Sequence, residues 1–359
     1  MRAEILVDFN EFWSRLNADI QSARQSVFVQ TFAFEGDPVG RLLADGLLHS
    51  PAPNKRVLAD SFTRIVLSDK LRYSPANIVD RQLRREARET TAMVRELESA
   101  GIAIRFTNPY GFSPRTILSR NHKKLMVVDE RIAYVGGMNF SEHNAAWHDM
   151  MLRIEDAAAA RFLREDFLST WNGRDRLARA RFNGSEIHTL DGRSNRKVFE
   201  KVLRLIDSAQ ESIFVESPYI TFPFYERLRS AARRGVRVTI LTPEQNNWNY
   251  FTEYARLESA LSEIDLRFYR GRMSHLKAML IDDQYLISGS SNFDYLSYRI
   301  YQEIVAITSN PEIIADFRER VMVPDLAESV PVVGRSSAMG RHWLTVHVRV
   351  LDAALSILT

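Results

Sequence analysis

The strongest constraint on this chain is a polar motif that occurs twice with the same internal spacing. Each copy reads His-x-Lys-x4-Asp and is followed by a Gly-Gly or Gly-Ser pair, with an asparagine two residues beyond the second member of the pair. The first copy comprises His122, Lys124, Asp129, Gly136, Gly137 and Asn139, and the second comprises His275, Lys277, Asp282, Gly289, Ser290 and Asn292. The histidines, the aspartates and the asparagines of the two copies are each 153 residues apart (275 minus 122 for the histidines). This spacing predicts an internal duplication.

A second pair of matching segments supports the duplication. Residues 22–29, Ser-Ala-x-x-Ser-Val-Phe-Val, return as residues 208–215, Ser-Ala-x-x-Ser-Ile-Phe-Val, with an offset of 186. The first half therefore holds 33 additional residues (186 minus 153) before its motif. We place this insertion at about residues 61–95.

The pattern of apolar residues predicts an α/β chain. In each half an amphipathic helix leads into a β-branched and aromatic run, at 27–34 and 213–220, which we interpret as a buried strand. Further helix–strand pairs are expected over 94–106 and 227–241, and such alternation favours mixed sheets covered by helices. We expect a first domain at 1–185, a second at 186–329 and a C-terminal tail at 330–359.

The polar motifs are predicted to lie on β-hairpins. Residues 124–128 and 132–135 form the expected strands of the first hairpin, and 276–281 and 285–288 form those of the second. The histidine and lysine share a strand face because residues i and i+2 point the same way, and the asparagine follows the neighbouring strand. Asp129 and Asp282 fall in the turns, where aspartate is favoured by local backbone hydrogen bonds, so we assign them a structural role.

Two segments outside the motifs allow alternative interpretations. In the insertion, one apolar stripe comprises Val79, Leu83, Ala87, Thr90, Val94 and Leu97, and the arginines mainly off it are Arg81, Arg84, Arg85 and Arg88. We expect a helix that packs on the core with a solvated basic face, with a membrane-surface or substrate-gating helix as the alternative. The apolar end of the tail is expected to dock on the body of the protein, with a surface anchor as the alternative.

Composition limits the kinds of reaction and partner that the chain can have. With 359 residues, 45% of them hydrophobic, the chain can bury a large core, and the absence of cysteine excludes disulfides and a cysteine nucleophile. Lys plus Arg (48) exceeds Asp plus Glu (45) by three, and the pI near 9.1 leans toward anionic partners such as phosphate or a lipid surface. The sequence shows neither a secretion signal nor a run of about 18 apolar residues. We therefore expect a cytoplasmic protein that meets a membrane only at its surface.

Each half supplies an imidazole, a fixed cation and an amide donor, a set that suits an anion. The histidines and carboxylates lack metal-ligand spacing, so we expect no metal or other cofactor. Two such sets around one phosphate would let one histidine attack phosphorus while the other protonates the departing alcohol. Asp149 and Glu303 follow their histidines by 27 and 28 residues and could each accept a hydrogen bond that fixes a ring tautomer.

These residues resemble the signature of the phospholipase D superfamily. Residues 121–124, 136–139 and 148–155 are in addition similar to bacterial cardiolipin synthases. The resemblance implies two α/β/α/β/α lobes related by a pseudo-two-fold axis, with one active site at the lobe interface. It also implies a metal-independent reaction through phosphohistidine, for which we favour His122 as the nucleophile.

The function expected from this resemblance is phosphatidyl transfer in a bacterial protein associated peripherally with the membrane. An anionic phospholipid, with phosphatidylglycerol favoured, would donate the phosphatidyl group to an alcohol. The alternatives are a phospholipase D that releases phosphatidic acid, a phosphodiesterase acting on nucleic acid, and a non-catalytic phosphate-binding module. A net charge of only +3 without a basic run argues against nucleic acid, and two complete motifs argue against the non-catalytic module. The exact lipids and the oligomeric state stay open.

Overall fold

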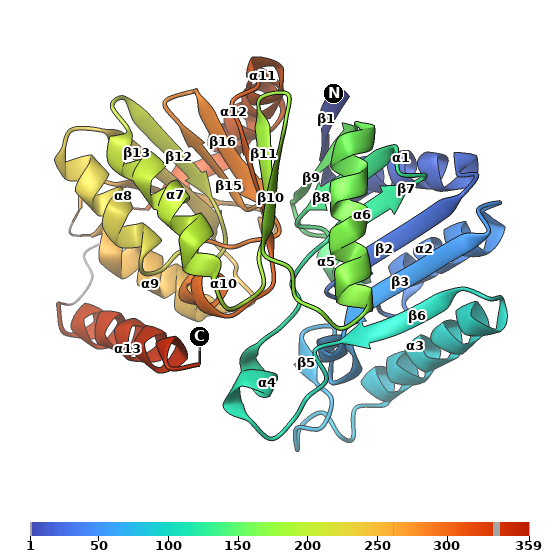
Figure 1. The fold of residues 1–359 in the computed structure, drawn as a ribbon. Helices are drawn as coiled ribbons and strands as arrows, with labels where there is room; N and C mark the ends of the chain where they lie inside the picture. Colours follow the sequence, from blue (N-terminus) through green and yellow to red (C-terminus); the bar gives the residue numbers. More distant parts are fainter. Residues whose placement is uncertain (1, 261, 333–337, 359) are drawn as a thin grey trace. The chain divides into compact units, whose positions relative to one another are not determined.

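The computed structural model describes residues 2–260, 262–332 and 338–358 and divides into two compact units. The units are Met1–Arg176 and Leu177–Thr359 (Figure 1). Each unit contains a mixed sheet with helices against it, so the predicted α/β class is confirmed. The division falls nine residues before the expected boundary at 185, because β10 (Ala178–Phe182) pairs with β11 (Ser185–Thr189) in the second sheet.

The first unit is built on a seven-stranded sheet with the order β1-β9-β8-β7-β2-β3-β6. These strands are β1 (Arg2–Val7), β2 (Ser26–Thr31), β3 (Asn54–Asp60), β6 (Ala103–Thr107), β7 (Leu125–Val128), β8 (Ile132–Gly136) and β9 (Met150–Glu155). β2, β3 and β6 run parallel to one another, and the remaining pairs are antiparallel.

The two faces of this sheet pack against different helices. Val27 and Val29 share one apolar cluster with residues of α1 (Asp8–Ser22) and α2 (Pro38–His49). Phe28, between them in sequence, stacks on Phe167 of α6 (Ala157–Trp171) at a centroid distance of 4.9 Å. The period of two in β2 thus explains why Val27, Phe28 and Val29 are all apolar: both faces of the sheet are covered here.

The second unit repeats this plan in a nine-stranded sheet with the order β10-β11-β17-β16-β15-β12-β13-β14-β18. Its further strands are β12 (Ser212–Glu216), β13 (Arg237–Pro243), β14 (Asp265–Tyr269), β15 (Ala278–Ile281), β16 (Tyr285–Gly289), β17 (Ile304–Thr308) and β18 (Ser329–Pro331). Its helices are α7 (Asn195–Ser208), α8 (Phe224–Arg233), α9 (Asn249–Ser259), α10 (Tyr295–Arg299), α11 (Pro311–Phe317), α12 (Val323–Glu328) and α13 (Ala338–Ser356), with a π-helical turn at Arg318–Met322. The order β16-β15-β12-β13-β14 matches β8-β7-β2-β3-β6 of the first unit, which confirms the duplication.

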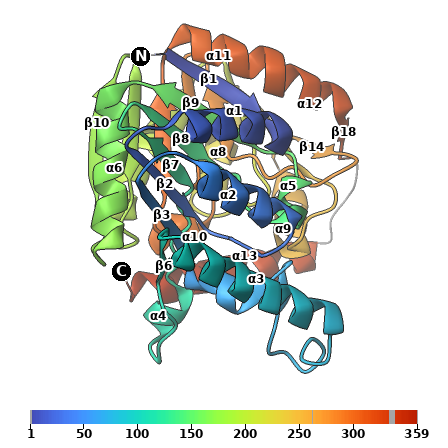
Figure 2. The same ribbon diagram turned by 90° about the vertical axis from the view of Figure 1, so that its right-hand side faces the viewer.

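The insertion lies next to β6, the edge strand of the first sheet, and contains a long helix (Figure 2). It comprises a 3₁₀ turn (Ser61–Arg64), β4 (Val66–Leu67), β5 (Lys70–Leu71) and α3 (Arg81–Ser99), with α4 (Pro114–Leu118) and α5 (Glu142–Ala145) further along the unit. Leu83, Ala87 and Leu97 of α3 are buried and its arginines are exposed, so the core-packing interpretation is confirmed. The assignment of Val79 to the buried stripe was wrong: Asp80 caps the helix through the N–H groups of residues 82 and 83, which leaves Val79 before it and exposed.

The tail packs on the second unit, as expected, through α13. Val348 and Leu355 belong to the apolar core of this unit, and Asp352 pairs with Arg299 of α10 at 2.6 Å. The tail predicted from residue 330 begins within β18, which pairs with β14, and its residues 333–337 lie outside the described residues. Within the described ranges, no helix has both the length and the apolar character that crossing a bilayer requires.

Candidate active site

Both hairpins place the histidine and lysine of their motif side by side, directly before a buried strand. His122 and Lys124 precede β7, and His275 and Lys277 precede β15; all four side chains are buried. Lys124 Nζ donates a hydrogen bond to the carbonyl oxygen of His122 at 2.9 Å, and Lys277 Nζ donates in the same way to His275. Each ammonium group is therefore held beside its own histidine.

The asparagine of each motif follows the return strand of the hairpin and lies against the loop after the opening strand. Asn139 Oδ1 accepts hydrogen bonds from Ala33 N and Thr31 Oγ1, both at 3.3 Å. These bonds fix the carbonyl end and leave the amide NH₂ as the end suited to an anion. In the second unit Asn292 is equally buried, and its Oδ1 has no hydrogen-bond partner among the described residues.

An aromatic ring lies against each histidine. Phe32, just after β2, meets the His122 ring edge-on at a centroid distance of 4.9 Å and also lies under Lys124 Nζ at 5.2 Å. Tyr219, in the matching loop after β12, lies 6.3 Å from the His275 ring at 79°. Both imidazoles thus have a partly apolar surrounding, which limits their rotation.

In the first unit, Asp149 lies against the second glycine of the motif. It directly precedes β9, and its Oδ1 accepts a hydrogen bond from Met150 N at 2.8 Å. Gly137 N donates to Met150 O at 3.2 Å, and a Cβ atom on Gly137 would lie only 2.3 Å from Asp149 Oδ1. Glycine is required here because the carboxylate occupies the space of a side chain.

In the second unit, Glu303 occupies the corresponding place before β17. It is fully buried and accepts hydrogen bonds from Ser290 Oγ at 2.5 Å and Ser297 Oγ at 3.0 Å. Ser290 Oγ also accepts from Ile304 N at 2.9 Å, which links the carboxylate to the strand. The serine of the Gly-Ser pair therefore contacts a glutamate where the glycine of the Gly-Gly pair contacts an aspartate.

The turn aspartates join the hairpins to the opening strands. Asp129 accepts three backbone hydrogen bonds, from the N–H groups of residues 24, 25 and 26 at 2.7–2.9 Å. Asp282 accepts three from residues 210, 211 and 212 at 2.8–2.9 Å. Partial burial alone would raise the pKa of each carboxyl, but the three donors outweigh it and lower the pKa. Both side chains also lie in the hairpin turns where the sequence placed them.

Sequence reasoning missed a buried ion pair that supports the segment containing His122. Asp60, the last residue of β3, accepts from Arg120 Nη1 at 3.1 Å and from Asn121 N at 2.6 Å. Complete burial raises the pKa of Asp60 to about 7, although Arg120 opposes the rise. The sequence signal that could have indicated this ion pair is an aspartate at the end of a buried strand.

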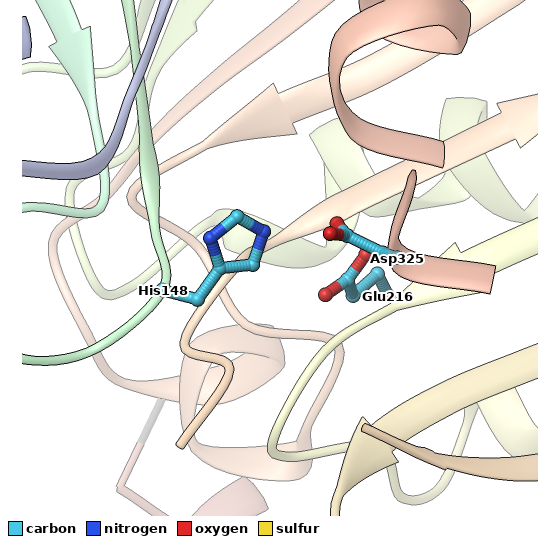
Figure 3. Close-up of side chains that lie close together, drawn as sticks. All are labelled: His148, Glu216 and Asp325. Carbon is cyan, nitrogen blue, oxygen red and sulfur yellow. The ribbon is translucent and has the colours of Figure 1, made fainter. Parts of the chain in front are cut away.

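A second missed contact ties the opening strand to the residue before each histidine. Gln30 Nε2 donates to Asn121 Oδ1 at 2.8 Å, and Ser274 Oγ donates to Glu216 Oε1 at 2.6 Å. The pairs are equivalent, since 30 plus 186 is 216 and 121 plus 153 is 274. Glu216 also lies beside Asp325 of α12, with carboxylate oxygens within 4.8 Å of each other (Figure 3).

Two further charge clusters lie in the first unit. Lys123, between the motif residues, points to the other face of the sheet, where its ammonium pairs with Asp166 at 2.8 Å and both side chains are almost completely buried. The carboxylates of Glu35, Asp37 and Glu86 lie within 4.8 Å of one another. Burial, together with a hydrogen bond and repulsion from Glu86, raises the pKa of Glu35 to about 9.

Comparison with known families agrees with this duplicated arrangement. The family described as "Cardiolipin synthase, PLD-like domain" matches residues 16–171 and 202–322, which include both motifs. The chain belongs to this phospholipase D-like family. It is therefore a member of a superfamily of phosphatidyltransferases and phosphodiesterases.

Several relatives of this phospholipase D-like chain are bacterial proteins. Cardiolipin synthase B of Salmonella typhimurium is 28% identical over 333 residues, covering 84% of this chain and 74% of the relative. Cardiolipin synthase B of Escherichia coli is 26% identical over 332 residues, covering 84% and 75%. The crystal structure of phosphatidylserine synthase from Haemophilus influenzae has a TM-score of 0.70 and 13% identity, covering 99% of this chain and 95% of that one. The structural likeness supports the shared fold.

Proposed function

We propose that this protein is a cardiolipin synthase-like phosphatidyltransferase. It would take a phosphatidyl group from phosphatidylglycerol and transfer it to the hydroxyl group of a second phosphatidylglycerol. The observation that carries the proposal is the presence, in both units, of the same buried histidine, lysine and asparagine before and after one hairpin. A reaction with two chemical steps needs a nucleophile and an acid–base, and the duplication supplies both.

In the first proposed step, a ring nitrogen of His122 attacks phosphorus. The bond between phosphorus and the glycerol oxygen breaks, and the His275 imidazolium donates a proton to that oxygen. The ammonium groups of Lys124 and Lys277 and the amides of Asn139 and Asn292 would donate hydrogen bonds to the phosphoryl oxygens as charge develops on them. The products are free glycerol and a phosphohistidine ester that carries the diacylglycerol.

In the second step, the acceptor hydroxyl gives its proton to His275 and attacks phosphorus. The bond between phosphorus and His122 breaks, which releases cardiolipin and restores both histidines. We assign Asp149 and Glu303 as positioning residues whose carboxylates accept a hydrogen bond from a histidine ring N–H and so fix the tautomer of the ring. Asp129, Asp282 and the Gly136–Gly137 and Gly289–Ser290 pairs would shape the hairpins on which the catalytic groups lie.

The proposal is tested by product analysis on bilayers. Purified protein is incubated with phosphatidylglycerol vesicles in EDTA, and lipids and glycerol are measured by mass spectrometry. Equal amounts of cardiolipin and glycerol are expected. Phosphatidic acid without cardiolipin would instead identify a phospholipase, and loss of turnover in EDTA alone would contradict the metal-independent mechanism.

Three variants separate the roles of the histidines. His122→Ala and His275→Ala should each lower turnover by at least 10³-fold, because each step needs both groups. His49→Ala, a control on an exposed ring of α2, should retain full turnover. With short-chain phosphatidylglycerol and long incubation, the intact-protein mass spectrum should show a slowly formed phosphatidyl adduct in His275→Ala, whose breakdown lacks the same acid–base group, and none in His122→Ala. An adduct in His122→Ala would reverse the two assignments.

A further inference from the structure

The insertion of the first unit forms a pocket that contains none of the motif residues. The pocket has a volume of about 290 Å³ and lies between the segment before α3, α3 itself and β6. Leu67, Ala87, Val94 and Phe106 give it an apolar lining, and Thr63, Thr90 and Thr91 add hydroxyl groups. The pocket is thus made almost entirely by residues that have no equivalent in the second half.

Three arginines give this pocket a positive charge. Arg64, Arg72 and Arg95 line it together with one acid, Glu98, so its formal charge is +2 (three minus one). Arg64 stacks on Phe106 at 4.7 Å, and Arg72 Nη1 donates to the carbonyl oxygen of Arg64 at 2.7 Å. Guanidinium groups held in this way present their remaining N–H donors as a fork that suits phosphate oxygens.

Ion pairs with carboxylates do not hold these three arginines within the described part of the chain. Among the described residues, no ion pair joins Arg64, Arg72 or Arg95 to an acid, whereas Arg85 on the same helix pairs with Glu89 at 2.8 Å. Glu98 offsets one of the three positive charges, and the remaining excess gives the pocket a positive potential that suits an external anion.

Exposed apolar side chains lie on the segment that connects the two parts of the pocket lining in sequence. Leu71, Tyr73, Ile78 and Val79 all lie within nine residues and expose between 48% and 69% of their surface. The guanidinium of Arg72 lies 5.4 Å from the centre of the Tyr73 ring, so the apolar segment contains a residue that lines the pocket. Single exposed apolar residues are common, but four in one short segment beside unpaired cations are typical of a surface that enters the boundary of a bilayer.

We propose that this pocket binds the phosphate headgroup of an anionic phospholipid and docks the protein on a membrane while the neighbouring apolar residues insert. The arginines would hold the phosphate, and residues 71–79 would contact the acyl region. The inference rests on the proposed function in one respect: a lipid substrate gives the enzyme a reason to bind bilayers. Free phosphates and nucleic acids share the anionic chemistry but would leave the apolar segment without a partner.

The test compares matched charge changes on vesicle binding. Flotation with vesicles of equal parts phosphatidylglycerol and phosphatidylcholine measures the partition coefficient of the full chain. Arg64→Gln/Arg95→Gln is expected to lower it about 10- to 30-fold, since each basic group near an anionic surface contributes roughly a fivefold factor. Arg84→Gln/Arg88→Gln, which removes the same charge from exposed positions of α3, is expected to lower it less than threefold. An equal loss of vesicle binding in both double variants, or no loss in the first, would contradict the assignment of this pocket as the headgroup site.

A second variant and a soluble ligand separate the other outcomes. Ile78→Ser/Val79→Ser should weaken vesicle binding at least fivefold without a change of charge. Unchanged binding would contradict the proposal that residues 71–79 insert into the bilayer. Glycerol phosphate at 10 mM should compete only weakly with vesicles; complete release would identify a pocket for soluble phosphates and contradict the lipid assignment. Because binding is measured without turnover, a failure of phosphatidyl transfer with charge-specific docking intact would count against the proposed function alone.

Discussion

Replacing Gly137 by alanine should impair the site while leaving the fold intact. A Cβ atom at this position would lie 2.3 Å from Asp149 Oδ1 and 2.4 Å from Oδ2, and its ordinary contacts begin near 3.4 Å. The carboxylate, or the backbone that carries it, must therefore move by about 1 Å (3.4 minus 2.3). Asp149 is anchored by its own strand through Met150 N, so the shift changes where its oxygens point.

The size of the effect follows from this displacement. Forcing a methyl group into a filled site typically costs about 1–3 kcal/mol of folding free energy. A misplacement of about 1 Å in a positioning group can lower turnover by about 10²-fold. We therefore expect Gly137→Ala to keep a cooperative unfolding transition but to lose about two orders of magnitude in kcat for phosphatidyl transfer.

The assay combines thermal unfolding with steady-state kinetics and uses Gly101→Ala as its control. Gly101 has a φ of +81° and nothing within 4 Å of an added Cβ, so alanine there costs about 1–2 kcal/mol through the backbone alone. The control should lower the melting temperature similarly and leave kcat within twofold of the parent. If Gly137→Ala retains more than half of the parental kcat, Asp149 does not position a group of the reaction.

Two further predictions concern buried charges of the first unit. The pKa of Glu35 is raised from 4.5 to about 9 in the folded state, so between these pH values the native state holds a proton that the unfolded state has lost, and the free energy of unfolding falls as pH rises. Glu35→Gln should remove this pH dependence. It should raise the free energy of unfolding at pH 8.5 by on the order of 2–4 kcal/mol and leave it unchanged at pH 4. Parallel stability curves for parent and variant from pH 4 to 9 would contradict this reasoning. Asp166→Ala should cost about 3–5 kcal/mol in urea unfolding because it leaves Lys123 charged and buried, whereas Lys123→Met/Asp166→Leu should lie close to the parent. Equal losses in the single and double variants would show that the pair matters through its packing and not its charge.

The sequence predicts the hairpins and the duplication well because both rest on local patterns. Alternating apolar runs, turn aspartates and fixed spacings are preserved in both halves, and the structure places β7–β8 and β15–β16 within two residues of the expected bounds. The contact between Gln30 and Asn121 could not be found in this way, since the two residues are 91 positions apart and their equivalents are Glu216 and Ser274. The repeat conserves the link but not the residue types.

The error at Val79 has a different physical origin. A periodic stripe shows which residues can share a helix face, but it does not show where the helix begins. Asp80 accepts hydrogen bonds from two N–H groups of the first turn, and this cap fixes the start of α3 at Arg81, two residues beyond Val79. The aspartate was visible in the sequence, and giving the capping residue more weight than the apolar period would have corrected the boundary.

The bonds of the turn aspartates also define what this architecture can tolerate. Asp129 reaches Arg24 across 105 residues and Asp282 reaches Gln210 across 72, and the difference of 33 equals the length of the insertion. Closing the longer connection costs only about 0.3 kcal/mol more by chain entropy. The chain between the opening strand and the hairpin can therefore differ in length at little cost in stability. Insertions in this connection can be gained or exchanged without disturbing the hairpin that carries the catalytic residues.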